Sequence, residues 1–294
     1  MTKVGGAALP NGVMMVCGDR AGIAVYDREG VLQKTSFQTV KNPVKIPYLR
    51  AFGSLYASTA TSAAAYFRAF RLRNAGAKDF GLGELAGFVG LLGGNTGLSA
   101  LRVQSEGLFR NLFRDKPGVR EPLLSLTDTF FDVLSVVLVF ATPAGKRTRG
   151  FHGAEHKVIS AGEKAGRIPT LDEAKEATRF HPRCGTSLSV ASMALYTVAS
   201  GVILPFVPEK ARESTRLGIL LLSLAVAYEG MASGKIGPVQ KLGLAAQRFT
   251  TREPDEEMLR AALEAYREAL KEEETAPEKP ERPIAAPRRR LEAI

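Results

Sequence analysis

The residues of this sequence that are best suited to chemistry lie in one short segment. All three histidines of the chain fall between positions 152 and 181. In Phe151-His152-Gly153-Ala154-Glu155-His156 the two imidazoles are four residues apart, so on a helix they project from one face and can bind one divalent ion. Glu155 lies beside this pair and can accept a proton from a water molecule that the metal activates. The segment therefore predicts a divalent metal site, and zinc is the metal we expect.

The spacing has a known chemical counterpart, because HxxEH is the pattern of inverted zinc hydrolases. Two imidazoles need a further protein ligand, since catalytic zinc usually has three and keeps one position open for water. The candidates for this ligand are His181, Cys184 and Glu229. Binding by both His181 and Cys184 would close the coordination sphere and give a structural site. A single further ligand would leave the metal open to chemistry.

Two other interpretations of these residues remain open. Cys184 can act as a nucleophile that His181 activates, although nothing in the sequence orients that histidine. The histidine pair can also belong to an ordinary surface helix without a metal. Gly153 costs about 1 kcal/mol relative to alanine inside a helix, so packing or the metal must stabilise this segment.

Long apolar segments on either side of this motif indicate a membrane protein. An uncharged run of about 20 residues is enough to cross the bilayer core. The candidate stretches are Leu85–Leu101, Leu123–Thr142, Ser187–Val207 and Leu217–Ala232. Asp128, Asp132 and Glu229 interrupt them and must face protein or water, because a carboxylate in lipid is costly. A compact soluble helical protein is the competing interpretation.

The remaining segments complete the predicted fold, which is mainly α: a polytopic helical membrane protein with a small N-terminal β-hairpin unit. Residues 1–45 form that β unit, and 46–250 form the helical, membrane-embedded domain with a metal-site loop at 143–186. A helix over 46–70 is expected to lie on the bilayer interface or to be an ordinary amphipathic helix. Residues 251–274 predict an amphipathic helix, and the tail 275–294 is expected to be disordered.

Charge gives the predicted orientation and partners. The chain carries 40 Lys and Arg against 30 Asp and Glu, a net charge of +10. These basic residues flank apolar segments, so we expect a lipid bilayer as partner and no nucleic acid. If all four stretches cross, the loop 143–186 shares a side with both termini, and its basic residues favour the cytoplasm. We expect an integral protein of the bacterial inner membrane with a cytoplasmic metal site.

Several motifs, taken in order along the chain, resemble one known group of proteins. They are Gly5-Gly6, Gly12-Val13-Met14-Met15, Ile46-Pro47-Tyr48-Leu49-Arg50, His152 to Lys157, Phe180 to Ser187, Tyr228-Glu229, and Thr251 to Asp255 preceded by Gln247. This pattern resembles the YqhQ-like family of uncharacterised membrane proteins, described as metal-dependent enzymes. The resemblance implies a multispanning protein whose metal site falls on the two histidine-bearing motifs, and it supplies no substrate.

The function expected from these features is a zinc-type membrane hydrolase. His152 and His156 would bind the metal, Glu155 would be the general base, and the substrate would be peptide or lipid-derived. Two alternatives remain: a membrane scaffold with a structural metal, and a metal or ion transporter that uses the intramembrane carboxylates.

Overall fold

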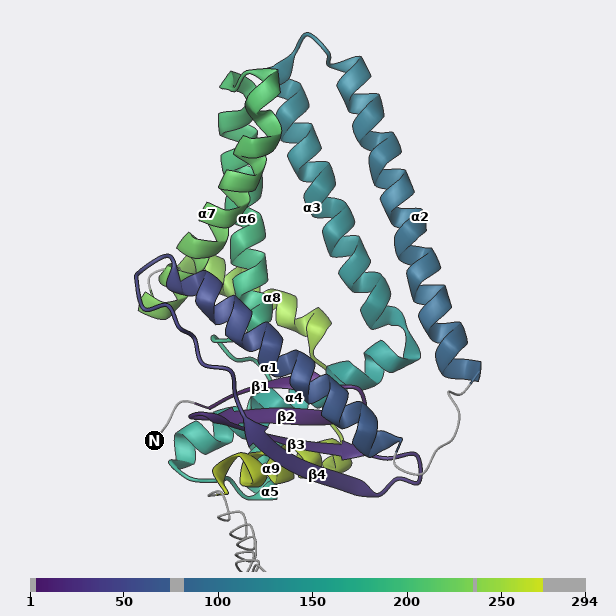
Figure 1. Cartoon of the computed structure of the whole chain (residues 1–294), viewed down its shortest axis with the longest axis vertical. Coiled ribbons are helices and arrows are strands. Elements are labelled where there is room, and N and C mark those ends of the chain that lie inside the picture. Colours follow the sequence, from purple (N-terminus) through teal and green to yellow (C-terminus); the bar gives the residue numbers. More distant parts are fainter. Residues whose placement is uncertain (1–3, 75–81, 235–236, 272–294) are drawn as a thin grey trace, which may run out of the picture.

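The computed structural model describes residues 4–74, 82–234 and 237–271, and it divides into a sheet-containing unit and an elongated helical bundle (Figure 1). The strands are β1 (Val4–Leu9), β2 (Gly12–Cys17), β3 (Arg20–Tyr26) and β4 (Leu32–Gln38). The helices are α1 (Arg50–Arg73), α2 (Leu82–Leu112), α3 (Pro117–Ala141), α4 (Pro143–Ala165), α5 (Leu171–Glu176), α6 (Gly185–Ile203), α7 (Arg212–Ser233), α8 (Gly237–Thr250) and α9 (Glu256–Leu270), with short 3-10 turns at Leu204–Phe206 and Glu209–Ala211. The predicted fold class is confirmed. The predicted tail 275–294 lies outside the described residues.

The β unit is a four-stranded antiparallel meander in the order β1-β2-β3-β4. Its first two turns are tight, because Leu9 pairs with Gly12 and Cys17 pairs with Arg20. Asn11 and Gly18 supply the positive φ angles, 66° and 63°, that such two-residue turns need. All four strands lie within the β unit predicted at residues 1–45, although the glycines and alanines of β1 have low β propensity.

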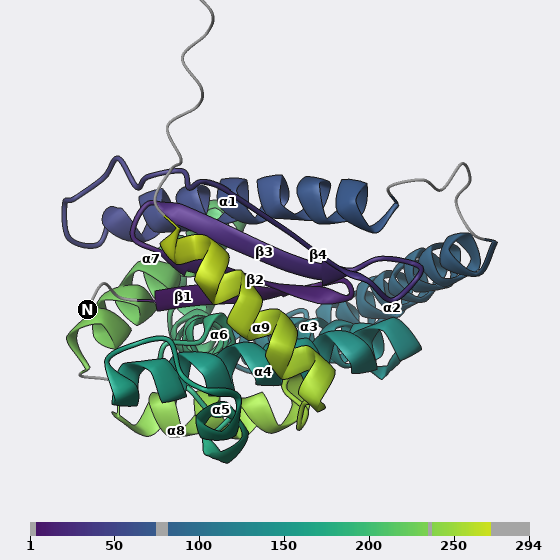
Figure 2. The same cartoon turned by 90° about the horizontal axis from the view of Figure 1, so that it is seen from below.

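Helices cover both faces of the sheet, so the β unit is a buried layer (Figure 2). On one face Val13 and Met15 pack with α4 and α9 through Phe151 and Tyr266. On the other face Met14 and Ile23 pack with the small residues of α1. Residues that alternate along β2 thus enter two separate cores, as the period of two in a strand requires. Helix α9 packs on the N-terminal sheet although it comes at the end of the described chain.

Within the described part of the chain, three helices of the bundle are long and apolar enough to cross a membrane. They are Pro117–Ala141, Gly185–Phe206 and Glu209–Ser233, each including its adjoining turn where there is one. They contain three of the four predicted spans. Their large side chains face outward, for example Phe130 at 60% exposure and Leu222 at 62%, which is the pattern expected of lipid-facing helices. The predicted span Leu85–Leu101 falls in α2, where the side chains up to residue 95 lie outside the described residues.

Ion pairs hold the carboxylates that interrupt the spans. Arg102 of α2 donates to Asp128 at 2.7 Å and to Asp132 at 3.0 Å, so both aspartates of α3 share one guanidinium. Arg216 of α7 donates to Glu121 at 2.5 Å, and the Glu121 side chain is fully buried. Pairing offsets the cost of placing these charges inside the bundle.

The sheet, α4, α5 and α9 all lie at the same end of the bundle (Figure 1). This follows from the helix directions, because α2 and α6 lead away from that end whereas α3 and α7 return to it. The histidine-bearing segment is therefore on the same side as the sheet.

Candidate metal centre

Helix α4 carries His152 and His156 on one face. The helix begins at the Thr142 cap, whose Oγ1 accepts a hydrogen bond from Gly145 N at 3.0 Å, and it ends at Gly166 in the left-handed conformation. One helical turn separates the two imidazoles, and their ring centroids lie 4.4 Å apart. The helix that the sequence predicts around this motif is thus present, and it brings the two rings together.

Gly153 lets another segment approach α4 closely beside His152. A Cβ at this position would overlap the Arg252 carbonyl oxygen, and Arg252 N donates to Arg149 O at 2.9 Å. The segment that follows α8 therefore lies directly on α4. This contact places the Thr250 carbonyl oxygen 2.9 Å from His152 Nδ1.

Both histidines have their Nδ1 atoms bound to backbone carbonyl oxygens. His152 Nδ1 bonds to Thr250 O at 2.9 Å, and His156 Nδ1 bonds to Arg179 O at 2.6 Å. A carbonyl oxygen only accepts, so each Nδ1 carries a proton and donates it. In the neutral rings each Nε2 is then an unprotonated ligand atom, held in orientation by an outer hydrogen bond as in natural metal sites.

Cys184 completes a group of three ligand atoms. It caps the N-terminus of α6, where its Sγ accepts from Thr186 N at 3.4 Å and lies 3.4 Å from His152 Nε2. One ligand atom from each of His152, His156 and Cys184 lies within 4.8 Å of the other two. A thiolate sulfur and an imidazole nitrogen on one tetrahedral zinc are about 3.6 Å apart. The geometry and the donor types therefore both fit a single transition-metal ion.

His181 lies near this group but is bonded elsewhere. Its Nε2 donates to Glu163 at 3.2 Å, and its Nδ1 accepts from Arg183 N at 3.3 Å. Its ring centroid is 6.0 Å from that of His156. Burial lowers the pKa of His181, which favours the neutral ring. Both ring nitrogens are occupied, and the side chain serves to anchor the 180–184 loop.

Glu229 is also separate from the group of three. Its carboxylate accepts two hydrogen bonds from Arg50, at 2.7 and 2.6 Å, and one from Tyr48 N at 2.9 Å. These bonds tie the end of α7 to the start of α1. Tyr48, which these bonds hold, has a φ of 66° that no helix accepts. Helix α1 therefore begins at Arg50 rather than at residue 46.

Glu155 is a residue of α4, and its side chain is buried against the first strand. A Cβ at Gly6 of β1 would lie 2.9 Å from Cγ of Glu155, so the glycine makes room for the carboxyl group. Among the described residues this carboxyl has no hydrogen-bond partner. Burial raises its pKa to about 7, and the charge of His152 acts in the opposite direction. An unpaired buried carboxyl group one helical turn from the ligand residue His152 is typical of a functional site.

Comparison with known proteins places the chain in a family. The model of a family described as "Protein of unknown function (DUF1385)" matches residues 111–272, more than half of the chain. The chain belongs to this family. It is 31% identical over 141 residues to the uncharacterized protein YqhQ of Bacillus subtilis (strain 168), which covers 44% of this chain and 42% of that relative. The chain thus matches less than half of the relative's length, and no solved structure matches it. The resemblance seen in the motifs is confirmed.

Parts of this DUF1385 site carry no signal in the sequence. The carbonyl oxygens of Thr250 and Arg179 orient the two imidazoles, and any residue supplies such an oxygen. Glu163 holds His181, but its position in α4 has no distinctive spacing. The Gln247 side chain bonds to both the N–H and the carbonyl of His181, each at 2.8 Å. Among these residues, Gln247 was part of a motif named in the sequence analysis, but the motif did not indicate what its side chain does.

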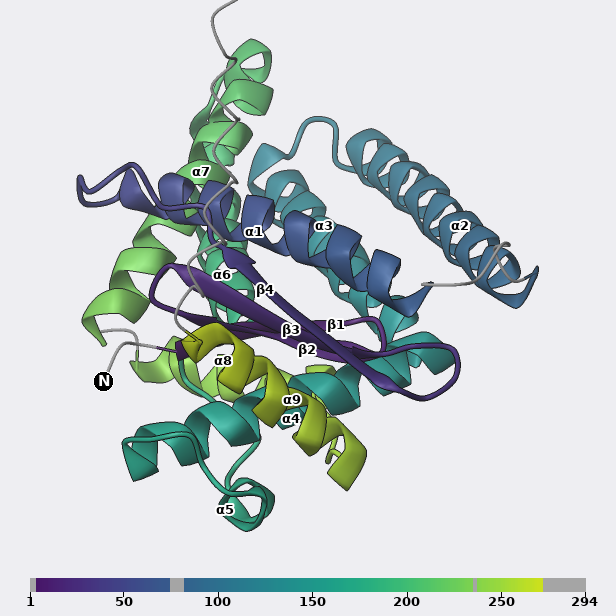
Figure 3. The same ribbon diagram turned by 60° about the horizontal axis from the view of Figure 1, so that its bottom comes forward.

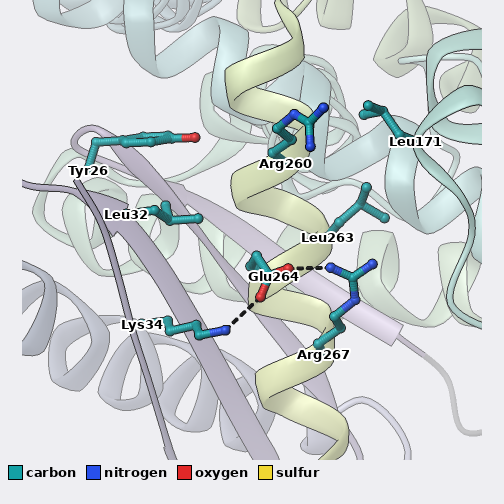
Figure 4. A pocket seen from close by; sticks show the side chains of 8 residues that line it. All are labelled: Tyr26, Leu32, Lys34, Leu171, Arg260, Leu263, Glu264 and Arg267. Carbon is teal, nitrogen blue, oxygen red and sulfur yellow. Dashed lines mark hydrogen bonds and ion pairs between the residues drawn. The ribbon is translucent and has the colours of Figure 1, made fainter. Parts of the chain in front are cut away.

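A cavity of about 420 Å³ lies apart from the metal group, between the sheet, α5 and α9 (Figure 4). Its lining comprises Tyr26, Leu32, Lys34, Leu171, Arg260, Leu263, Glu264 and Arg267. Glu264 binds both Lys34 and Arg267, so its charge is used within the wall. None of the three ligand residues lines this cavity.

Proposed function

We propose that this DUF1385 protein is a membrane-bound, metal-dependent hydrolase with zinc held by His152, His156 and Cys184. The observation that carries the proposal is the convergence of these three side chains. Each imidazole has its Nδ1 committed to a carbonyl, and the remaining ligand atoms lie within 4.8 Å of one another. A surface helix with two incidental histidines has no reason for this arrangement.

Glu155 is the proposed general base. A divalent ion in this position would lower the pKa of a water molecule and so supply a nucleophile near neutral pH. The carboxyl of Glu155 is buried, is adjacent to His152 on the helix and has no other bonded partner among the described residues, so it is free to accept a proton. The surrounding side chains exclude bulk water.

The number of ligands favours catalysis over a purely structural metal. Structural zinc sites are usually closed by four protein ligands, whereas catalytic sites have three. His181 is the nearest further donor, and both of its ring nitrogens are already bonded. The rival function is a scaffold, in which the metal only fastens α4 to the start of α6.

A cysteine nucleophile is a second candidate, because Cys184 Sγ lies 3.4 Å from His152 Nε2. This scheme assigns no role to His156, whose Nε2 is oriented in the same way. Activity that persists after chelation of the metal would favour the cysteine mechanism.

The proposed location is the bacterial inner membrane, with the sheet and α4 on the cytoplasmic side. Lys146, Arg147 and Arg149 at the start of α4 support this orientation under the positive-inside rule. The substrates in keeping with the location are membrane-borne peptides or lipid-derived molecules.

The test compares Glu155→Gln with the wild-type protein in detergent or nanodiscs, against panels of peptide and lipid esters. The expected result is full metal content with turnover lost. Glu176→Gln is the matched control, because it makes the same chemical change at an exposed glutamate of α5 that bonds to none of the three described ligand residues. Turnover that is unchanged in Glu155→Gln would refute the catalytic role, and a protein that binds metal without any turnover would support the scaffold.

A further inference from the structure

Helix α1 has its large apolar side chains on the outside and its small ones on the inside. The buried residues are Ala51, Gly53, Ala57, Thr61, Ala65 and Ala69. The exposed ones include Leu55, Tyr56, Tyr66, Phe67 and Phe70. At 100° per residue the two sets lie on opposite sides of the helix. The outward face is therefore aromatic, and Phe67 is 73% exposed.

Helix α8 repeats this arrangement. Its Gly243 lies against Ser187 of α6, so the inward side is closely packed. Leu242 and Phe249 face outward, the latter at 69% exposure. Neither α1 nor α8 contains an aspartate or a glutamate, whereas both contain lysine or arginine. Their exposed faces are thus apolar and basic.

Helix α8 lies across the direction of the spans where the bundle meets the sheet unit, and α1 runs obliquely past this junction toward the sheet (Figure 1). Seen from below, α1 and α8 run on opposite sides of that unit (Figure 2), and the intermediate view shows α1 crossing in front of α3 (Figure 3). Helix α8 packs on the span α6 and α1 contacts the span α7, so the exposed faces of both helices adjoin the lipid-facing bundle.

We propose that α1 and α8 lie in the headgroup region of an anionic bilayer and form an interfacial belt around the junction. An apolar face with aromatic residues and an accompanying basic face is the composition of helices that lie in the membrane surface. Negatively charged lipids attract lysine and arginine there. A soluble protein partner would not require a face that is continuous with the lipid-facing sides of the spans.

The belt determines the depth of the candidate metal centre. Cys184 directly precedes the span α6, and the Thr250 carbonyl that orients His152 ends α8. The three ligand residues are consequently held at the level of the bilayer surface. This inference concerns placement alone and is independent of whether the site is catalytic.

The experiment uses the absence of tryptophan from the chain. Single-tryptophan variants Phe67→Trp and Phe249→Trp of the full chain are reconstituted in vesicles of phosphatidylcholine with phosphatidylglycerol. The phosphatidylcholine carries bromine either near the glycerol or near the chain ends. We expect both variants to lose more fluorescence to the shallow bromines than to the deep ones. Phe130→Trp, in the middle of α3, should show the reverse order, and Val31→Trp, exposed in the β3–β4 turn, should be unaffected by either.

The outcomes separate the possible occupants of these faces. Fluorescence of Phe67→Trp that is insensitive to both bromines, with Phe130→Trp quenched as expected, would overturn the belt and assign the face to protein, including a second copy of this chain. Equal quenching by shallow and deep bromines would contradict the interfacial depth. Arg71→Glu in the Phe67→Trp background should weaken shallow quenching only when phosphatidylglycerol is present, and no change would refute the preference for anionic lipid.

Discussion

Replacing Gly153 with alanine should weaken the metal centre without touching a ligand. Two effects oppose each other at this position. Alanine favours an isolated helix by about 1 kcal/mol over glycine. The new Cβ, however, overlaps the Arg252 carbonyl oxygen, and overpacking against fixed atoms costs about 1–3 kcal/mol. The Arg252 backbone is itself bonded to α4 through Arg149 O, so it cannot move away independently. We therefore expect net destabilisation of up to about 2 kcal/mol.

The strain from the new Cβ also disturbs the contact between the Thr250 carbonyl and His152, and loss of such an outer partner lowers metal affinity about 10- to 100-fold. Affinity is measured by competition with a chromogenic chelator, and stability by denaturant unfolding in detergent. Gly107→Ala is the control, because nothing lies within 4 Å of a Cβ there, and it should be neutral or stabilising. A Gly153→Ala protein that is more stable than wild type, with unchanged affinity, would refute the close-approach explanation.

Four further substitutions test the assignments. Cys184→Ala should remove the metal whereas His181→Ala should retain it, as determined by metal analysis of both purified proteins; the opposite result would exchange their roles. Glu229→Gln should leave metal content unchanged and lower stability only slightly, since its bonds to Arg50 are partly exposed; metal loss in this variant would make Glu229 a ligand. Glu121→Gln should destabilise the bundle by about 3 kcal/mol, because it leaves buried guanidinium groups without their carboxylate, and an unaltered unfolding midpoint would contradict the network.

The sequence alone was sufficient to predict the features that depend on residues close together in the chain. The spans follow from apolar length, and the meeting of His152 with His156 follows from helical spacing. Helix ends were less predictable. The start of α1 depends on the bond between Tyr48 N and Glu229, two residues that are far apart in the chain.

The third ligand residue depends on tertiary contacts. His181, Cys184 and Glu229 are equally suitable by residue type, and only the folded chain brings Cys184 to His152 while it occupies the other two with Glu163 and Arg50. The orienting carbonyls are part of the backbone, so no residue type reveals them. The packing of α9 on the sheet likewise joins the two ends of the described chain, which a local pattern does not encode.

Metal analysis of the detergent-purified chain by plasma mass spectrometry, beside a His152→Ala/His156→Ala double variant, tests the central claim most directly. We predict a near-stoichiometric transition metal, zinc, in the native chain and its loss from the double variant, with both proteins folded by circular dichroism. A native chain without bound metal, or equal metal in both proteins, would contradict the proposed centre.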